Sequence, residues 1–434
     1  MDLLQYKEVQ IHPVDKLEGT LAPPASKSYS ARAVLAATLA PGTSRIDNLA
    51  DSLNVQAMID CCEALGAQIR RTDTGAVDVT GPDRLRDGTT LCPGNSGIVL
   101  RLLLGATAHL RRTTFITPYV ESLGRRSNQE MVDALRTLGV RCTLDGDHGR
   151  LPITLEGGPG VHGGAVGISG RRSSQFLSGL LYLGALLDAP LEVRVEDELK
   201  ARPMVHTTLR VLCSAGIRVD ADDELMHYRI PADTAFHPAH YTVGSDPAST
   251  AALLAVAAAV DSSVEIRHNG LEELSGVLRY LAQIGVPVTE QQSSLRVHGG
   301  GDLSPCDFDG SKAPDAVLPL AALVAHADGT SRFYNIEHLR YKECDRISDF
   351  RRELQRAGIS TEEERDTLIV HGSRAGSPGD AVVESHYDHA VVMAMSVIAL
   401  RSRSGLTIKD PQYVAQTYPG FFDDLRRLGG TVTA

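Results

Sequence analysis

The sequence lacks the features that mark membrane-spanning and exported proteins. Its 434 residues contain no continuous apolar run of about 20 residues, the length that a membrane-spanning helix needs. Glycine or proline interrupts the longest apolar stretches, as is typical of buried helices. The first residues, MDLLQYKE, show no basic segment followed by an apolar run, so no signal peptide is expected. We therefore expect a cytoplasmic protein with no membrane partner.

Cysteine spacing and net charge exclude further classes. The seven cysteines are odd in number and form no CxxC pair, which indicates reduced thiols rather than a metal site or a disulfide framework. Aspartate and glutamate (54) outnumber lysine and arginine (43), and the net charge of −11 argues against binding to nucleic acid. An acidic protein can still bind small anions where its cations converge.

The segment SKSYSAR, residues 26–32, predicts such an anion site. It follows two prolines and precedes an apolar run, so the chain arrives as a loop and then begins a helix. Lys27, Ser28 and Arg32 fall in the first turns of that helix. The unpaired N–H groups and partial positive charge of a helix N-terminus attract anions, and two cations strengthen this effect. The alternative is an ordinary serine N-cap with two solvated cations.

The same arrangement of polar head and apolar helix occurs six times along the chain. The heads are SKSYSAR at 26–32, GNSG at 94–97, RRSSQ at 171–175, DPAST at 246–250, PD at 314–315 and HYDH at 386–389. Amphipathic helices alternate with them, each ending in a glycine that suits a left-handed C-cap before a strand: Gly66, Gly139, Gly216, Gly285, Gly358 and Gly429. This self-similarity predicts six α/β units, each with one buried and one surface helix.

Three units fill each half of the chain, so the fold class is α/β with two similar domains. We expect the first domain at 23–242 and the second at 1–22 plus 243–434. Residues 1–22 are predicted to form a strand pair that packs with the second half.

Two groups of charged residues in the second half of the chain, Asp315 and the cluster at 342–346, could have either a structural or a functional role. Asp315 precedes an apolar helix, so it is either an N-cap or a base held at a domain junction. On a helix, Lys342 and Arg346 would be i,i+4 neighbours, and Glu343 and Arg346 would be i,i+3 neighbours. They could form a solvated salt-bridged face, but the cluster follows a strand-like run as the other heads do. We therefore favour an anion site.

Together these segments resemble the 5-enolpyruvylshikimate-3-phosphate (EPSP) synthase family of carboxyvinyltransferases. The matching motifs run along the whole chain: SKSYSAR, GNSGIVLR, RRSSQFL, PDAVLPLAAL, NIEHLRYKECDRI, SHYDHA and VAQTYPGFFDDLRRLGG. The resemblance implies an inside-out α/β barrel in each domain, with buried parallel helices, surface sheets and an active-site cleft between the domains. It also implies small anionic substrates, a monomer, and neither a metal nor an organic cofactor.

The resemblance implies transfer of the enolpyruvyl group of phosphoenolpyruvate to the 5-hydroxyl of shikimate 3-phosphate, with release of phosphate. Asp315 would be the base, and Glu343 with Lys27 the acid, because a carbon must gain a proton while an alcohol attacks its neighbour. The residues implied for shikimate 3-phosphate are Lys27, Ser28, Arg32, Ser173, Ser174, Gln175, His338 and Lys342. Those implied for phosphoenolpyruvate are Asn95, Gly97, Arg126, Arg346 and His389.

The chain departs from the family pattern mainly at the phosphoenolpyruvate site. Ala390 stands where the family has an arginine, and Gln416 where it commonly has a lysine. Losing two charge-assisted contacts could weaken the handling of this substrate by about 10²- to 10⁴-fold, unless Arg125 or Arg172 compensates. The further departures are Ile98, Ser127, Ala201, Met204 and His338.

These departures leave alternatives open. The protein could eliminate phosphate or water from shikimate 3-phosphate without phosphoenolpyruvate, as a lyase of secondary metabolism. It could also be a transferase for another acceptor, or a non-catalytic protein that binds a shikimate-like anion.

Overall fold

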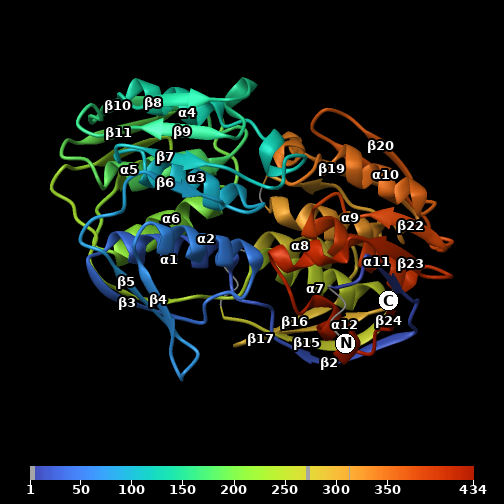
Figure 1. Cartoon of the computed structure of the whole chain (residues 1–434). Coiled ribbons are helices and arrows are strands. Elements are labelled where there is room, and N and C mark those ends of the chain that lie inside the picture. Colours follow the sequence, from blue (N-terminus) through green and yellow to red (C-terminus); the bar gives the residue numbers. More distant parts are fainter. Residues whose placement is uncertain (1–4, 270–273, 312) are drawn as a thin grey trace. The chain divides into compact units, whose positions relative to one another are not determined.

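The computed structural model describes residues 5–269, 274–311 and 313–434 (Figure 1). The chain divides into two compact units: unit 1 comprises Met1–Pro24 and Gly244–Ala434, and unit 2 comprises Ala25–Val243. Each unit contains three four-stranded sheets, and the structure confirms the predicted α/β fold with a repeated α/β unit. Within the described ranges, no helix is both long and apolar enough to cross a membrane.

Unit 2 places its three sheets around three buried helices (Figure 1). The buried helices are α1 (Lys27–Leu39), α3 (Gly97–Ala106) and α5 (Ser174–Gly184), and the outer ones are α2 (Leu53–Ala64), α4 (Gln129–Thr137) and α6 (Arg202–Ser214). The first sheet has the order β14 (His240–Thr242), β3 (Gly42–Asp47), β5 (Val77–Gly81) and β4 (Gln68–Arg71). The second has the order β6 (Thr89–Leu91), β7 (Thr113–Phe115), β9 (Ile153–Glu156) and β8 (Arg141–Leu144). The third has the order β10 (Gly164–Ile168), β11 (Leu191–Val195), β13 (His227–Ile230) and β12 (Asp220–Ala221).

Unit 1 repeats this plan. Its buried helices are α7 (Pro247–Ala259), α9 (Val317–Val324) and α11 (His389–Arg401), and the outer ones are α8 (Ser275–Gln283), α10 (Ser348–Arg356) and α12 (Phe421–Arg427). One sheet has the order β16 (Val288–Gln291), β17 (Ser294–Gly299), β15 (Asp261–Arg267) and β2 (Lys16–Leu21). Another has the order β18 (Phe308–Asp309), β19 (Gly329–Tyr334), β21 (Leu368–Gly372) and β20 (Ser360–Glu363). The last has the order β22 (Ala381–Glu384), β23 (Leu406–Lys409), β1 (Glu8–Ile11) and β24 (Val432–Thr433). Short 3₁₀ helices lie at η2 (Leu123–Arg125), η3 (Asp147–Gly149), η5 (Pro314–Ala316), η6 (Glu337–Tyr341) and η7 (Pro411–Gln416).

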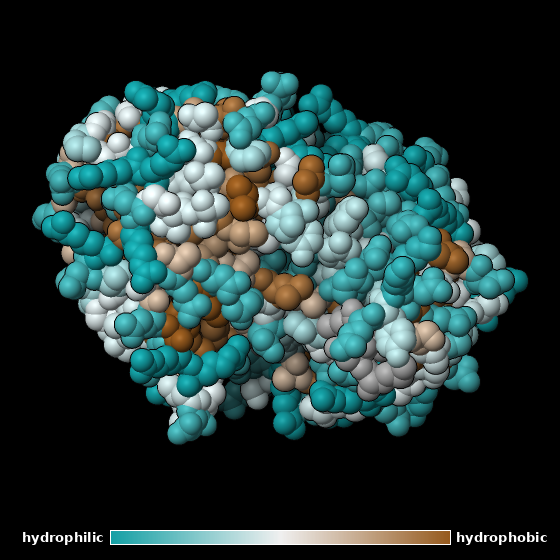
Figure 2. Space-filling model, in the orientation of Figure 1, coloured by the Kyte–Doolittle hydropathy of each residue, from teal (hydrophilic) through white to brown (hydrophobic). Residues whose placement is uncertain are grey.

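The predicted caps explain where the helices begin and end. Five of the six buried helices begin after a side chain that accepts a backbone N–H: Ser26, Ser96, Ser173, Asp246 and Asp388. The six glycines predicted to end the outer helices all have positive φ angles, between 82° and 113°. The buried helices have almost no exposed side chain, which explains why they are apolar on every face. On the face shown in Figure 2 the surface is mostly hydrophilic, with apolar residues in small groups.

The two strands predicted within residues 1–22 are present and belong with the second half of the chain, but the prediction that they pair with each other is wrong. β1 pairs antiparallel with β23 and β24, whereas β2 pairs parallel with β15, so the two strands belong to different sheets of unit 1. The connection His12–Asp15 contains no glycine or asparagine for a tight hairpin turn. Backbone bonds from His12 to Thr431 and from Val14 to Leu400 instead carry the chain from one sheet to the next.

The core of unit 1 contains one histidine that burial keeps uncharged. His326 follows α9 and is 0% exposed, and neither of its ring nitrogens has a hydrogen-bond partner in the described part of the chain. Burial, and to a lesser extent the nearby Arg401, lowers the pKa of His326 to about 3. The unfolded chain therefore takes up a proton near pH 6.5 that the folded protein does not bind, and stability falls as the pH drops below that value.

Replacing this histidine should therefore flatten the acid side of the stability profile. Between pH 7 and pH 5 we expect His326→Leu to lose about 2 kcal/mol less stability than the unmodified protein, measured by urea unfolding. His298→Leu, at an exposed position of β17, is the control and should leave the slope unchanged. Parallel slopes for the unmodified protein and His326→Leu would show that His326 does not titrate on unfolding.

Candidate functional site

The head of α1 is built around a buried arginine. Arg32 is 0% exposed; its Nε donates to Thr208 Oγ1 of α6 at 2.7 Å, and its Nη1 donates to Ser28 O at 2.9 Å and Ser28 Oγ at 2.6 Å. The Ser28 hydroxyl in turn donates to Met204 Sδ at 3.2 Å. A thioether is a weak acceptor, so a ligand oxygen could replace it at low cost. Arg32 thus orients Ser28 within the first turn of α1, where Lys27 is the first helical residue.

The head of α3 is shaped by the absence of a side chain at Gly97. A Cβ atom there would lie 2.9 Å from Arg126 Nη1, and 3.7 Å from Gln175 Oε1. Gly97 therefore lets the Arg126 guanidinium lie over the N-terminus of α3. Asn95 fixes the loop that carries this arginine, because its Oδ1 accepts the N–H of Leu123 at 3.1 Å. The structure thus brings together Asn95, Gly97 and Arg126, the three residues of unit 2 predicted for phosphoenolpyruvate.

The head of α5 lies next to that of α3. Ser173 caps the helix by accepting the N–H of Gln175 at 3.2 Å, and Ser174 is buried at the first helical position. Both Ser173 and Gln175 also contact Arg101 of α3, a residue that the sequence analysis did not single out. Arg172, one of the two cations considered as a compensating ligand, forms an ion pair with Glu130 at 3.3 Å.

In unit 1, three carboxylates surround one arginine. Arg346 is 2% exposed, and its guanidinium binds Asp388 through Nε at 2.8 Å and Nη2 at 3.0 Å. Its Nη1 reaches Asp315 Oδ1 at 3.0 Å, and its Nη2 reaches Glu343 Oε2 at 3.3 Å. Asp388 is fully buried and Glu343 is 10% exposed, whereas Asp315 is 41% exposed. Asp315 is therefore the carboxylate of this cluster that a ligand can approach most easily.

Burial and charge compete within this cluster. Burial by itself would raise the pKa of Asp388, but the Arg346 guanidinium outweighs it and lowers that pKa below its usual range. Burial raises the pKa of the Cys344 thiol, which lies 3.5 Å from Asp388 Oδ2. Asp388 thus remains a carboxylate that holds Arg346, and Arg346 in turn holds the two carboxylates predicted as base and acid.

The structure shows the partners of these charged residues and corrects one predicted spacing. Asp315 lies within η5 and is the N-cap residue of neither η5 nor α9, and its Oδ1 accepts a hydrogen bond from Arg346 Nη1. The helical spacing assumed for Lys342 is wrong, because the chain after η6 is extended there and α10 begins only at Ser348. Glu343 and Arg346 still form an ion pair, but on a turn. His338 is buried in η6, and Lys342 follows directly after it.

Ala390 at the head of α11 and Gln416 at the end of η7 are the two departures predicted to affect the phosphoenolpyruvate site. His389 and Ala390 open the helix and are each 3% exposed, and Asp388 caps it by accepting the N–H of Ala390 at 2.8 Å. Gln416 is 2% exposed, and its Nε2 donates to the carbonyl of Tyr387 at 3.0 Å. Sequence reasoning did not select Asp388 as a site residue, although an aspartate directly before an apolar helix is a recognisable N-cap signal.

Each unit therefore has its own group of predicted residues. Unit 2 brings together Ser173, Gln175, Gly97 and Arg126 beside Arg101. Unit 1 brings together Asp315, Glu343 and Arg346. Within the ranges that the structure describes, no three His, Cys, Asp or Glu side chains gather as a metal site would require.

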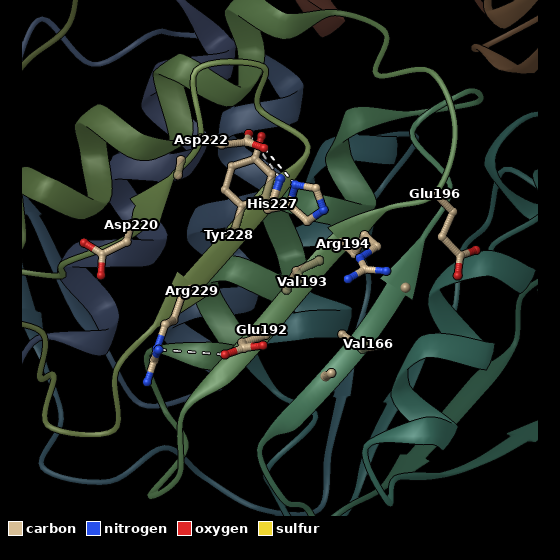
Figure 3. A pocket seen from close by; sticks show the side chains of 13 residues that line it. Val166, Glu192, Val193, Arg194, Glu196, Asp220, Asp222, His227, Tyr228 and Arg229 are labelled. Carbon is tan, nitrogen blue, oxygen red and sulfur yellow. Dashed lines mark hydrogen bonds and ion pairs between the residues drawn. The ribbon is translucent and has the colours of Figure 1, made fainter.

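A hollow of about 550 Å³ lies elsewhere, on the third sheet of unit 2 (Figure 3). It forms because Ala165 and Gly167 of β10 pair with Glu192 and Arg194 of β11 and offer no long side chain of their own. Two pairs of lining side chains contact each other, His227 with Asp222 at 2.7 Å and Arg229 with Glu192 at 3.9 Å. No residue of the predicted site lines it.

The comparisons with known proteins agree with this architecture. A family model described as EPSP synthase (3-phosphoshikimate 1-carboxyvinyltransferase) matches residues 11–425. A 3-phosphoshikimate 1-carboxyvinyltransferase of Burkholderia pseudomallei is 46% identical over 99% of this chain and 96% of its own length. A protein of the same name from Deinococcus radiodurans is 36% identical over 97% of this chain and 96% of its own length. The EPSP synthase structure of Acinetobacter baumannii covers 99% of this chain and all of its own, with a TM-score of 0.81 at 23% identity, a likeness that concerns the fold alone.

Proposed function

The chain belongs to the EPSP synthase family, and on this premise we propose that it transfers the enolpyruvyl group of phosphoenolpyruvate to the 5-hydroxyl of shikimate 3-phosphate and releases phosphate. The observation that carries the proposal is the 46% identity, over 99% of this chain, to a relative named for this reaction. The carboxylate cluster of unit 1 supports it, because the reaction needs a base and an acid in fixed positions.

The transfer takes place in two steps, an addition and an elimination. When the alcohol oxygen attacks C2 of phosphoenolpyruvate, a base takes the hydroxyl proton and an acid delivers a proton to C3. When the C2–O bond to phosphate then breaks, C3 gives back its proton and the double bond is restored. We assign the base, which takes the hydroxyl proton, to Asp315. We assign the acid, which delivers the proton to C3, to Glu343 with Lys27. Arg346 supports this assignment, since its Nη1 and Nη2 hold the two carboxylates in place.

Substrate binding is proposed for the residues that the resemblance implies. Ser173, Ser174 and Gln175 would bind the phosphate of shikimate 3-phosphate, and Arg126 at the N-terminus of α3 would attract the anionic phosphoenolpyruvate. We also propose that the protein acts as a monomer in the cytoplasm without a cofactor, and the seven free cysteines are compatible with that compartment.

The relatives give no support to the eliminating alternative, and one experiment separates it from transfer. Phosphate release from shikimate 3-phosphate is measured with and without phosphoenolpyruvate, and the products are identified by mass. We expect release only when both are present, together with an enolpyruvyl adduct. Release without phosphoenolpyruvate, leaving a dehydrated or dephosphorylated ring, would refute the transferase.

Gln416 offers a test of the altered phosphoenolpyruvate site. Its Oε1 is buried without a hydrogen-bond partner in the described ranges, so a lysine could replace it without losing a second bond. We expect Gln416→Lys to lower the KM for phosphoenolpyruvate about tenfold, because it adds one cation near the head of α11. Gln412→Lys, on the same 3₁₀ helix, is the control for added charge alone. An equal KM in both variants would place Gln416 away from this substrate.

A further inference from the structure

Helices α3 and α5 approach so closely that a side chain of one reaches the N-terminus of the other. A Cβ atom on Gly105 of α3 would lie 1.9 Å from the carbonyl oxygen of Gly179. A Cβ atom on Gly179 of α5 would lie 2.4 Å from the carbonyl oxygen of Arg101. Only glycine permits this contact between the two backbones. The contact brings Arg101 beside the first turn of α5.

Arg101 is held firmly in that place. It is 6% exposed, and its Cζ lies 4.7 Å from the centroid of the Phe176 ring, a cation–π contact that fixes the plane of the guanidinium. Its Nη1 donates to Ser173 Oγ at 3.1 Å and to Gln175 Oε1 at 2.9 Å. A guanidinium can only donate, so it occupies acceptor positions on both side chains.

These bonds decide which atoms of Ser173 and Gln175 remain for a ligand. Ser173 Oγ already accepts the N–H of Gln175 at 3.2 Å, so both of its lone pairs are used and its O–H is left to donate. Gln175 presents Oε1 to Arg101, which turns its NH₂ group to the other side. Within the described ranges the structure gives neither donor a protein acceptor, and both side chains are partly exposed.

We propose that Arg101 is a positioning residue that makes Ser173 and Gln175 act as hydrogen-bond donors toward the phosphate group of shikimate 3-phosphate. The inference rests on the proposed function. A phosphate dianion accepts hydrogen bonds and donates none, so an amide oxygen or a hydroxyl lone pair facing it would repel it. A serine hydroxyl and a glutamine amide can each donate or accept a hydrogen bond. The Arg101 guanidinium takes up their acceptor atoms and so leaves them to donate.

The test compares two ligands that differ only in the phosphate group. Calorimetric Kd values for shikimate 3-phosphate and for shikimate are measured on the unmodified protein, Arg101→Met and Arg101→Lys. We expect Arg101→Met to weaken the binding of shikimate 3-phosphate about 10- to 100-fold and that of shikimate less than threefold. The Kd of Arg101→Lys for shikimate 3-phosphate should lie between those of the unmodified protein and Arg101→Met. A purely structural role would weaken both ligands alike, and that result, or no change, would overturn the proposal.

A matched control and a double variant complete the experiment. Arg136→Met removes an arginine of the same unit that donates to the Cys142 carbonyl at 3.1 Å, and it should leave both Kd values unchanged. If Arg101 acts through Gln175, the loss in Arg101→Met/Gln175→Met should be smaller than the two single losses combined. Additive losses would overturn the proposal. If Arg101→Met does not fold, the same comparison is made with Arg101→Lys.

Measuring turnover distinguishes a failure of this inference from a failure of the proposed function. Unmodified protein that binds shikimate 3-phosphate but forms no enolpyruvyl adduct would refute the function, while the Kd comparison would still decide the role of Arg101. Unmodified protein that binds shikimate as tightly as its 3-phosphate would overturn the inference whatever its turnover.

Discussion

Asp315→Asn is expected to lower kcat about 10²- to 10⁴-fold, the usual contribution of a general base, with the Kd for shikimate 3-phosphate within threefold of the unmodified value. Asparagine keeps an oxygen that can accept the bond from Arg346 Nη1, but it cannot take the proton of the attacking hydroxyl. Activity should therefore fall while the geometry of the cluster is retained. Phosphate release at saturating concentrations of both substrates gives kcat, and calorimetry gives the Kd.

Asp328→Asn is the matched control for this variant. Asp328 also forms an ion pair with an arginine, Arg374, at 3.2 Å, but its side chain is 61% exposed. We expect its kcat to stay within twofold of the unmodified protein. If Asp315→Asn kept more than one tenth of the unmodified kcat, Asp315 could not be the base, and the role would pass to another group.

Arg346→Met is expected to destabilise unit 1 by about 3 to 5 kcal/mol at pH 7, the usual cost of leaving a buried charge without its partner. The fully buried Asp388 would lose its two bonds to the guanidinium, and Asp315 and Glu343 would each lose one. Methionine fills a similar volume, so the loss measures charge more than packing. The measurement is urea unfolding followed by circular dichroism.

The pH dependence of this loss distinguishes charge from packing. In the unmodified protein the pKa of Asp388 is lowered, so its contribution is present above the unfolded pKa of about 4 and is lost as the pH falls. Without Arg346, burial would raise the pKa of Asp388, and proton uptake would then stabilise the folded variant. The difference between the two proteins should therefore shrink from pH 7 to pH 5. A constant difference would indicate a packing defect.

The control for Arg346→Met is Arg374→Met. Arg374 pairs with Asp302 and Asp328 at 3.2 Å each, but its side chain is 57% exposed. Exposed ion pairs contribute about 1 kcal/mol or less, because water screens the charges. An equal loss in both variants would mean that burial does not set the energy of the Arg346 cluster.

The sequence by itself determined the parts of the fold that depend on neighbouring residues. Polar heads before apolar runs marked the starts of helices such as α1, α5 and α7, and in the structure a serine or an aspartate of the head caps each of them. Glycine after an amphipathic run marked the ends, and Gly66 and Gly429 show the left-handed φ that this position needs. Caps and helix periodicity act within one or two turns, so the local sequence contains the whole signal.

Only the tertiary structure decided which helix N-termini contact each other and which charged side chains form ion pairs. Arg101 bonds to Gln175, 74 residues later, and Arg346 to Asp388, 42 residues later. β1 pairs with strands near the other end of the chain rather than with β2. No spacing rule encodes such contacts, because they depend on how closely helices pack and on which strand edges remain open. The sequence thus named most members of the candidate site. The contact of Arg346 with Asp315 and that of Arg101 with Gln175, in contrast, depend on packing between distant segments.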